Sequence, residues 1–255
     1  MKENEIFYPE EGNNLCYQIE PKSYWFNHRN EVIYQLLYKY KQSGSFWDVG
    51  GGNGFVSAFL QEKGYNCTLI EPGPKGCENG RKRGLKNVFE GILQDYSTTE
   101  QPDIIGAFDV VEHIEDDNGI VKEIYNRLET DGIFISTVPA FQNLWSADDI
   151  LAGHFKRYTI KTYTELLGKV GFEVEYCSYF FSFIAPPLYL IKALPFLFTK
   201  KFPKKIDFEK TKSQHELSGI SKTIFEPWMK WEQKKVKQLL KIPFGSSIIC
   251  VALKK

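Results

Sequence analysis

Four glycines follow a short apolar segment near residue 50 and are the strongest sign of chemistry in this chain. The sequence there is Phe46-Trp47-Asp48-Val49-Gly50-Gly51-Gly52-Asn53-Gly54. Glycine is favoured where φ must be positive or where a ligand must approach the backbone closely. A helix that begins directly after such a turn offers free N–H groups to a polar ligand. The motif therefore predicts a strand, a tight turn and a helix, expected over residues 55–63, around a polar ligand.

An acidic residue ends the next apolar segment. Residues 66–70 read as a second strand, and Glu71 follows them directly. An acid at the tip of the second strand of a doubly wound sheet can hydrogen-bond a ribose diol. We therefore expect a nucleoside-containing cofactor, with Pro72 either packed on its base or serving only as a turn residue.

The spacing of the glycines separates two cofactor classes. The dinucleotide motif needs a small residue at its last position, but Phe55 stands there. The pattern Asp48-x-Gly50-x-Gly52-x-Gly54 is complete, and it resembles the first motif of class I S-adenosylmethionine-dependent methyltransferases. A nicotinamide-dependent oxidoreductase remains the alternative enzyme class, and a glycine-rich turn without a ligand remains the structural alternative.

A second stretch, Phe108-Asp109-Val110-Val111-Glu112-His113, resembles a segment found in a branch that includes quinone-biosynthesis methyltransferases. The resemblance implies that Ala107 and Phe108 line the methionine part of S-adenosylmethionine, with His113 at the edge of the pocket. Alternatively, Glu112 and His113 form a network that only shapes the loop.

The same resemblance suggests further cofactor contacts. Many relatives carry an acid where this chain has Ile92, so adenine would be bound here by backbone groups of Ile92 and Leu93. Trp25 and Arg29 resemble an N-terminal element of the branch. Arg29 could pair with the carboxylate of the cofactor in two parallel hydrogen bonds, and an aromatic ring could favour its sulfonium. Otherwise Arg29 is a surface residue beside an apolar helix face.

Residues 137–158 are expected to form the acceptor side of the site. They contain His154, Arg157 and Tyr158 in a pattern similar to one in the same branch. His154 or His113 could take a proton from a hydroxyl acceptor, while Tyr158 and Arg157 could orient an anionic or sugar-like one. A structural alternative is that Asp148 pairs with His154 or Arg157 simply to hold the loop.

Composition excludes several other classes. The five cysteines have no paired spacing, which favours a reducing, cytoplasmic location over a disulfide framework. The four histidines lack ligand spacing, so the sequence predicts no metal site. The formal net charge is zero, which disfavours nucleic acid as a partner. A small-molecule acceptor is therefore expected.

Apolar and polar segments alternate in a way that predicts βαβ units and a parallel sheet. Expected strands cover residues 45–49, 66–70, 87–91, 104–110, 132–138, 172–183 and 246–253. Expected helices cover residues 55–63, 74–83, 117–129 and 160–170, with Gly171 as a C-cap. The resemblance implies a Rossmann-like, doubly wound, seven-stranded, mostly parallel α/β sheet whose last two strands pair antiparallel.

The chain divides into four parts on this reading. Residues 1–44 would form an N-terminal helical cap, 45–183 the cofactor-binding core, 184–244 a helical insertion or lid, and 245–255 the final strand. Residues 184–205 are apolar and then lysine-rich, which makes them a candidate for peripheral membrane contact. The alternative is a buried strand end followed by a lid or dimer face.

Together these motifs predict methyl transfer from S-adenosylmethionine to a small molecule, with oxygen as the weakly preferred acceptor atom. The acceptor could be linked to a sugar, a quinone or a lipid. A cofactor-binding protein without turnover is the third possibility.

Overall fold

The computed structural model describes residues 10–199 and 219–255, and its centre is a seven-stranded sheet. The strand order is β3-β2-β1-β4-β5-β7-β6, and only β7 runs antiparallel to its neighbours. The strands are β1 (Ser45–Val49), β2 (Asn66–Glu71), β3 (Asn87–Glu90), β4 (Ile104–Phe108), β5 (Ile133–Pro139), β6 (Phe172–Phe180) and β7 (Ser247–Lys254). The predicted doubly wound fold and its antiparallel last pair are confirmed.

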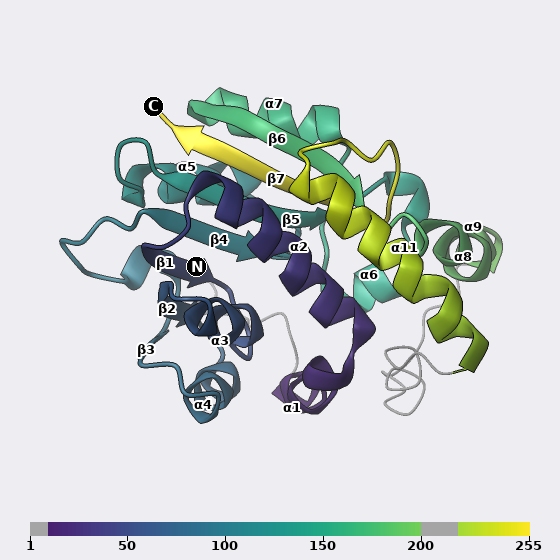
Figure 1. Cartoon of the computed structure of the whole chain (residues 1–255), viewed down its shortest axis with the longest axis horizontal. Helices are drawn as coiled ribbons and strands as arrows, with labels where there is room; N and C mark the ends of the chain where they lie inside the picture. Colours follow the sequence, from purple (N-terminus) through teal and green to yellow (C-terminus); the bar gives the residue numbers. More distant parts are fainter. Residues whose placement is uncertain (1–9, 200–218) are drawn as a thin grey trace.

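Helices cover both faces of the sheet (Figure 1). One face carries α2 (Tyr24–Tyr40), α3 (Phe55–Glu62) and α11 (Gly219–Lys237), and the other carries α5 (Asp117–Arg127) and α7 (Ile160–Val170). The remaining helices are α1 (Glu10–Ile19), α4 (Pro74–Lys82), α6 (Ala147–Ala152), α8 (Ala185–Leu188) and α9 (Leu194–Thr199). Short helical turns are η1 (Glu20–Lys22), η2 (Leu93–Asp95), η3 (Val111–His113), η4 (Gln142–Leu144) and the π-helical η5 (Tyr189–Ala193).

The sequence explains why these elements begin and end where they do. Strands β1, β4 and β5 are almost wholly buried, as expected for parallel strands covered on both faces. Helix α7 begins with a capping box at Thr159 and ends at Gly171, whose φ of 114° suits only glycine well. The predicted C-cap is therefore confirmed.

Two strands end at least two residues earlier than the sequence predicted, in both cases before a residue with positive φ. Strand β4 ends at Phe108 because Asp109 has φ 58°, and β6 ends at Phe180 because Phe181 has φ 56°. Neither residue is glycine, so the sequence gives no sign of the turn. The short helix α6 was likewise hidden inside a segment expected to be a loop.

Helix α11, which lies between β6 and β7 in the sequence, packs against α2. Helix α11 lies beside α2 in Figure 1, and the buried Glu232 of α11 bonds to His28 of α2 at 2.9 Å. Glu232 also accepts the backbone N–H groups of Phe181 and Ser182, at 3.0 and 2.6 Å. One carboxylate thus joins two helices and the end of β6. Among the described residues, no helix is both long enough and apolar enough to cross a membrane.

Candidate functional site

The glycine-rich turn stands at the carboxyl end of β1 with an open face. Gly52 has φ 55°, and a Cβ placed on it would meet no atom of residues 10–199 and 219–255 within 4 Å, so these residues leave space beside it. A Cβ on Gly51 would lie 2.5 Å from the Cγ of Asp48, so the turn closes tightly over that carboxylate. Positive φ and close approach both require glycine here. The turn can therefore present its backbone to a ligand.

Asp48 itself is fully buried under this turn. Its Oδ2 accepts the hydroxyl of Ser57 at 2.7 Å, while Oδ1 has no hydrogen-bond partner among the described residues. Burial raises the pKa of Asp48 to about 6, and the nearby Glu71 adds to the rise. The residue predicted to bind cofactor therefore lies beneath the turn and supports it from below.

Glu71 links the second strand to the glycine turn. Its Oε2 accepts the N–H of Gly52 at 2.9 Å, and its Oε1 accepts the N–H of Gly73 at 2.8 Å. Burial raises its pKa although both N–H groups oppose the rise. Carboxylate oxygens accept more than one hydrogen bond each, so Glu71 can hold the turn and still accept from a ribose hydroxyl.

Other predicted cofactor residues differ in what their side chains can offer. The Asn53 side chain is committed to the protein: it donates to Asn13 and Glu20 and accepts from Asn79. Pro72 is half-buried at the edge of the turn. After β3, the Ile92 side chain is exposed and that of Leu93 is buried, so an apolar surface from Ile92 is available to a base.

The end of β4 is tied to α2 and β5 through Asp109. Its Oδ2 accepts from Nη1 of Arg29 at 2.7 Å, and its Oδ1 accepts the hydroxyl of Thr137 at 3.0 Å. Arg29 is 8% exposed, so it is not a surface residue, and its Nε has no hydrogen-bond partner in the described part of the chain. The Nε–H of this buried guanidinium is thus left without a protein acceptor among these residues.

Aromatic rings pack around the Arg29–Asp109 ion pair. Trp25 stacks on Phe181 with ring centroids 5.1 Å apart, and the Arg29 guanidinium lies 4.9 Å from the Trp25 ring. Ala107 and Phe108 are buried at the end of β4, where Phe108 packs on Phe46. A Cβ on Gly50 would lie 2.9 Å from the Val110 side chain. The glycine turn and the loop after β4 are therefore in direct contact.

The loop after β5 is organised by Asp149, whereas the structural alternative drawn from the sequence named Asp148. Asp149 accepts from Nδ1 of His154 at 2.8 Å and from Nε and Nη2 of Arg157 at 2.7 and 3.1 Å. Asp148 pairs instead with Lys192. Burial alone would raise the pKa of Asp149, but His154, Arg157 and the Ser146 N–H together lower it. Asp149 is therefore a buried anion that fixes both basic side chains.

Arg157 and Tyr158 are occupied by structural partners. Arg157 also donates to the carbonyl of Ala140 at 3.1 Å, and Tyr158 donates its hydroxyl to Asp117 at 2.9 Å. Lys156 reaches the same Asp117 oxygen at 2.8 Å. These contacts hold the loop against α5. Arg157 and Tyr158, which were predicted to orient an acceptor, therefore stabilise the loop.

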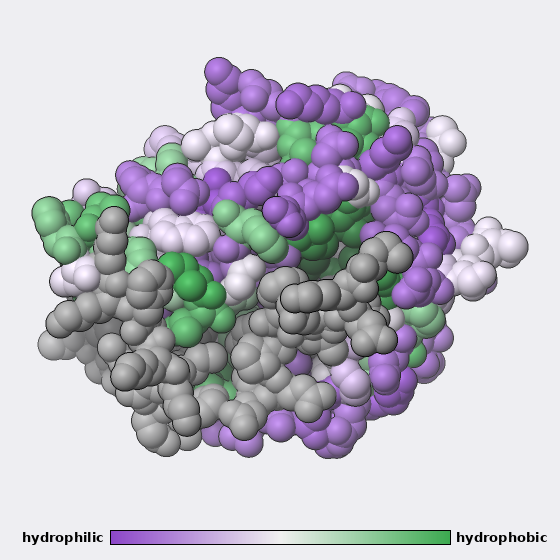
Figure 2. Space-filling view, turned by 180° about the vertical axis from the view of Figure 1, so that it is seen from behind, coloured by the Kyte–Doolittle hydropathy of each residue, from purple (hydrophilic) through white to green (hydrophobic). Residues whose placement is uncertain are grey.

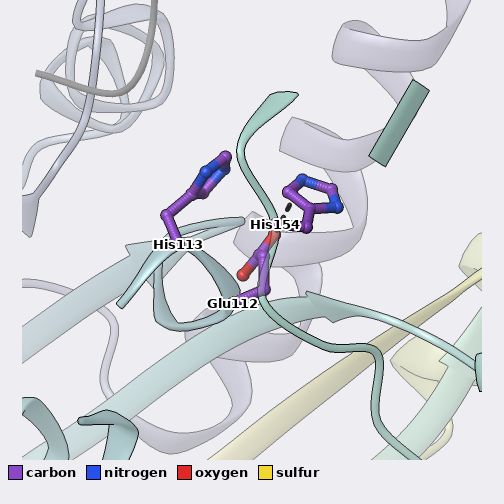
Figure 3. Close-up of side chains that lie close together, drawn as sticks. All are labelled: Glu112, His113 and His154. Atoms are coloured by element: carbon purple, nitrogen blue, oxygen red, sulfur yellow. Dashed lines mark ion pairs between the residues drawn. The ribbon is translucent and has the colours of Figure 1, made fainter. Parts of the chain in front are cut away.

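Three side chains converge where the loop after β4 meets the loop after β5 (Figure 3). Glu112 points toward the His154 ring, with Oε1 and Nε2 4.0 Å apart. The rings of His113 and His154 have centroids 4.6 Å apart. Burial lowers the pKa of His113 to about 4, assisted by His154, and burial raises that of Glu112 well above its usual range, assisted by Asp109. The sequence suggested His113 and His154 separately, and only the fold brings them together.

Comparison with known proteins identifies the family of the chain. A sequence profile described as "Methyltransferase domain" matches residues 27–176, more than half of the chain. A Mycolicibacterium smegmatis protein described as a probable S-adenosylmethionine-dependent methyltransferase is 25% identical over 175 residues, which is 66% of each chain. A ubiquinone biosynthesis O-methyltransferase of Rickettsia typhi is 27% identical over 97 residues, 36% of this chain and 39% of that protein.

The fold is shared with solved structures at lower identity. Phosphoethanolamine N-methyltransferase 2 of Haemonchus contortus, solved with S-adenosyl-L-methionine, has a TM-score of 0.58 and 13% identity over 98% of this chain and 58% of that chain. At this identity the likeness concerns the fold alone. The chain spans less than two thirds of the length of these curated relatives. Profile, relatives and sheet topology agree on the family: the chain belongs to the methyltransferase-domain family, within the class I S-adenosylmethionine-dependent methyltransferases.

Proposed function

We propose that this protein transfers a methyl group from S-adenosylmethionine to a hydroxyl oxygen of a small molecule. The observation that carries the choice of oxygen is the bond between His154 Nδ1 and Asp149 Oδ1. A carboxylate on one ring nitrogen fixes the tautomer and leaves the other nitrogen as a proton acceptor. A hydroxyl acceptor needs such a base more than an amine does. The O-methyltransferase likeness of the Rickettsia relative supports the same choice.

The donor fits the residues that the structure places around the glycine turn. The free space beside Gly52 can admit the amino-acid part, and Glu71 has acceptor capacity for the ribose hydroxyls. Arg29 has an unpartnered Nε for the carboxylate, and Ile92 offers apolar surface for adenine. When bound, the donor supplies a sulfonium methyl group that an aligned nucleophile can attack without further activation.

The residues of this chain then have separate tasks. The Gly50–Gly54 turn, Glu71 and Arg29 hold the donor, while Ala107 and Phe108 exclude water beside it. His154 or His113 would take the proton of the acceptor hydroxyl, whose oxygen would receive the methyl group that the bound donor supplies. In this proposal the expected insertion, residues 184–244, serves as a lid over the acceptor; its residues 200–218 lie outside the described part of the chain.

A binding and turnover comparison tests the function. Calorimetric titration should show S-adenosylhomocysteine binding but no NADH or NADPH binding. His154→Ala should leave that affinity unchanged and lower methyl transfer to a hydroxyl acceptor by roughly 10²- to 10⁴-fold. Asp148→Asn is the matched control, because Asp148 is the neighbour of Asp149 and its side chain pairs with Lys192. Tight dinucleotide binding, or loss of cofactor affinity in His154→Ala, would contradict the proposal.

We further propose that the protein is cytoplasmic and touches a membrane surface through residues 184–205. The five free cysteines fit a reducing compartment. Exposed apolar side chains gather on η5 and α9, at the left edge of Figure 2; they are Leu190, Ile191, Leu197 and Phe198. The lysines at 200–205 lie outside the described residues. Co-sedimentation with anionic vesicles, lost in Phe198→Ser, would support contact, and no binding by the full chain would exclude it.

A further inference from the structure

We infer that Arg83 is a positioning residue for the methyl donor, because it holds helix α1 over the nucleoside end of the donor site. Arg83 directly follows α4 and is far from α1 in the sequence. Its Nη2 donates to the Glu20 carboxylate at 2.6 Å and to the carbonyl of Tyr17 at 3.3 Å. One guanidinium therefore joins the end of α1, and the short turn η1 that follows it, to the end of α4.

The same guanidinium also holds the glycine-rich turn. Arg83 Nε donates to the carbonyl of Asn53 at 3.0 Å. The Asn53 side chain donates in turn to the carbonyl of Asn13 in α1 at 2.9 Å and to Glu20 Oε1 at 3.3 Å. Helix α1 and the turn proposed to hold the donor thus belong to one hydrogen-bond network that includes Arg83.

Helix α1 reaches the proposed ribose end of the donor site through Asn13. This residue is buried, and its side-chain nitrogen would lie 3.6 Å from a Cβ built on Gly73. The N–H of Gly73 is held by Glu71, the acid proposed to bind the ribose. Helix α1 also packs against α4, which begins directly after Gly73 (Figure 1). The first helix therefore lies beside the nucleoside end, whereas Arg29 of α2 is proposed for the carboxylate end.

The ion pair between Arg83 and Glu20 is buried. The two side chains are 11% and 8% exposed, whereas Glu78, in the surface pairs of α4, is 49% exposed. Burial raises the pKa of Glu20, and Arg83 opposes this rise more than any other neighbour. The rings of Tyr17 and Phe55 lie 4.4 and 4.9 Å from the guanidinium. Removing Arg83 would leave a buried carboxylate without its charged partner, which is costly, so the contact of α1 with α4 would weaken.

This arrangement gives Arg83 a role in how long the donor stays bound. Because α1 lies beside the nucleoside end, a bound nucleoside leaves more readily when α1 moves away from α4. Loss of one partner of a buried ion pair acts mainly on the dissociation rate, and less on the association rate. In this inference Arg83 contacts neither donor nor acceptor and acts through α1 and Asn53. The inference rests on the donor site proposed above.

Stopped-flow dissociation of S-adenosylhomocysteine from the full chain tests the inference, with tryptophan fluorescence as the signal. Arg83→Met should raise the dissociation rate roughly tenfold or more and leave the association rate nearly unchanged. Arg81→Met is the matched control, because Arg81 is an exposed arginine on α4. It should release the ligand at the wild-type rate.

A double-variant comparison separates the ion pair from a general loss of stability. Glu20→Gln should also speed dissociation, but Glu20→Gln/Arg83→Met should be no faster than Arg83→Met alone, because both changes break one interaction. Amide hydrogen exchange of residues 13–19 gives a second readout. S-adenosylhomocysteine should protect this segment in the wild type and protect it less in Arg83→Met. A network that only stabilises the fold would change neither readout at a temperature where all variants are folded.

Two results would overturn the inference: dissociation from Arg83→Met at the wild-type rate, or equal protection of residues 13–19 by the ligand in both proteins. Thermal unfolding identifies a variant that fails to fold. Arg83→Lys, which keeps the charge but lacks the guanidinium fork, then replaces Arg83→Met and should still speed dissociation. A wild type that does not bind S-adenosylhomocysteine would refute the proposed donor site itself, whereas normal binding that is insensitive to Arg83 would refute only this inference.

Discussion

The Glu71 carboxylate accepts the backbone N–H of Gly52 at 2.9 Å and thereby joins the tip of β2 to the glycine-rich turn after β1. The same carboxylate holds Gly73 at the start of α4. One side chain thus sets the spacing between the turn and the start of α4. The proposed ribose contact of Glu71 depends on this arrangement.

Glu71→Ala should weaken S-adenosylhomocysteine binding by about 10- to 100-fold, because charge-assisted hydrogen bonds contribute about 1.5–3 kcal/mol. Calorimetric titration measures the change. Glu78→Ala is the matched control, since Glu78 is an α4 acid whose side chain pairs with Lys75 and Lys82. Equal affinity in Glu71→Ala and wild type would exclude the ribose contact.

Arg29→Met should discriminate between two ligands. If the guanidinium holds the cofactor carboxylate, S-adenosylhomocysteine should bind roughly tenfold or more weakly. 5′-Methylthioadenosine lacks that carboxylate and should bind almost as before. Any general disturbance from loss of the Asp109 pair would affect both ligands alike. Arg81→Met, an exposed change on α4, controls for charge, and an equal loss for both ligands would contradict the assignment.

The stability of the protein should depend on pH through Asp48. Burial raises its pKa in the folded state to about 6, above the ordinary 3.8. The protonated Asp48 carboxyl therefore stabilises the folded state. This contribution is complete below pH 3.8, the ordinary pKa, and is lost as the pH rises to about 6. Asp48→Asn removes the ionisable group. The free energy of unfolding of this variant minus that of wild type should therefore increase between pH 4.5 and 7. Urea unfolding at several pH values measures this difference, and Asp95→Asn at an exposed acid is the control. A difference that does not change with pH would refute the prediction.

Glu232→Gln should destabilise the protein by about 1–3 kcal/mol, the usual cost of leaving a buried donor unsatisfied. Its two oxygens accept from the backbone N–H groups of Phe181 and Ser182, and an amide can accept only one of them. Chemical unfolding gives the value. Glu165→Gln on the exposed face of α7 should change stability by less than about 0.5 kcal/mol. Similar losses of stability in the two variants would show that the hydrogen bonds of Glu232 contribute little to the free energy of unfolding.

Much of the fold could be predicted from local patterns. Alternating strand and helix segments predict a parallel doubly wound sheet, because such segments pack in few ways. The glycines after Asp48 mark a turn because only glycine adopts those φ values readily, and Glu71 marks a strand tip. The early ends of β4 and β6 were missed because Asp109 and Phe181 adopt positive φ without being glycine.

The sequence by itself determined the glycine turn, the acid at the tip of β2 and the presence of histidines in the loops, since these depend on residue type and local spacing. Only the tertiary structure decided the partners: Asp149 rather than Asp148 for His154, Asp109 for Arg29, and Glu112 beside both histidines. The physical reason is that hydrogen bonds and ion pairs act over a few ångströms. Which distant segments come that close is set by the order of strands in the sheet and by the loops that leave it.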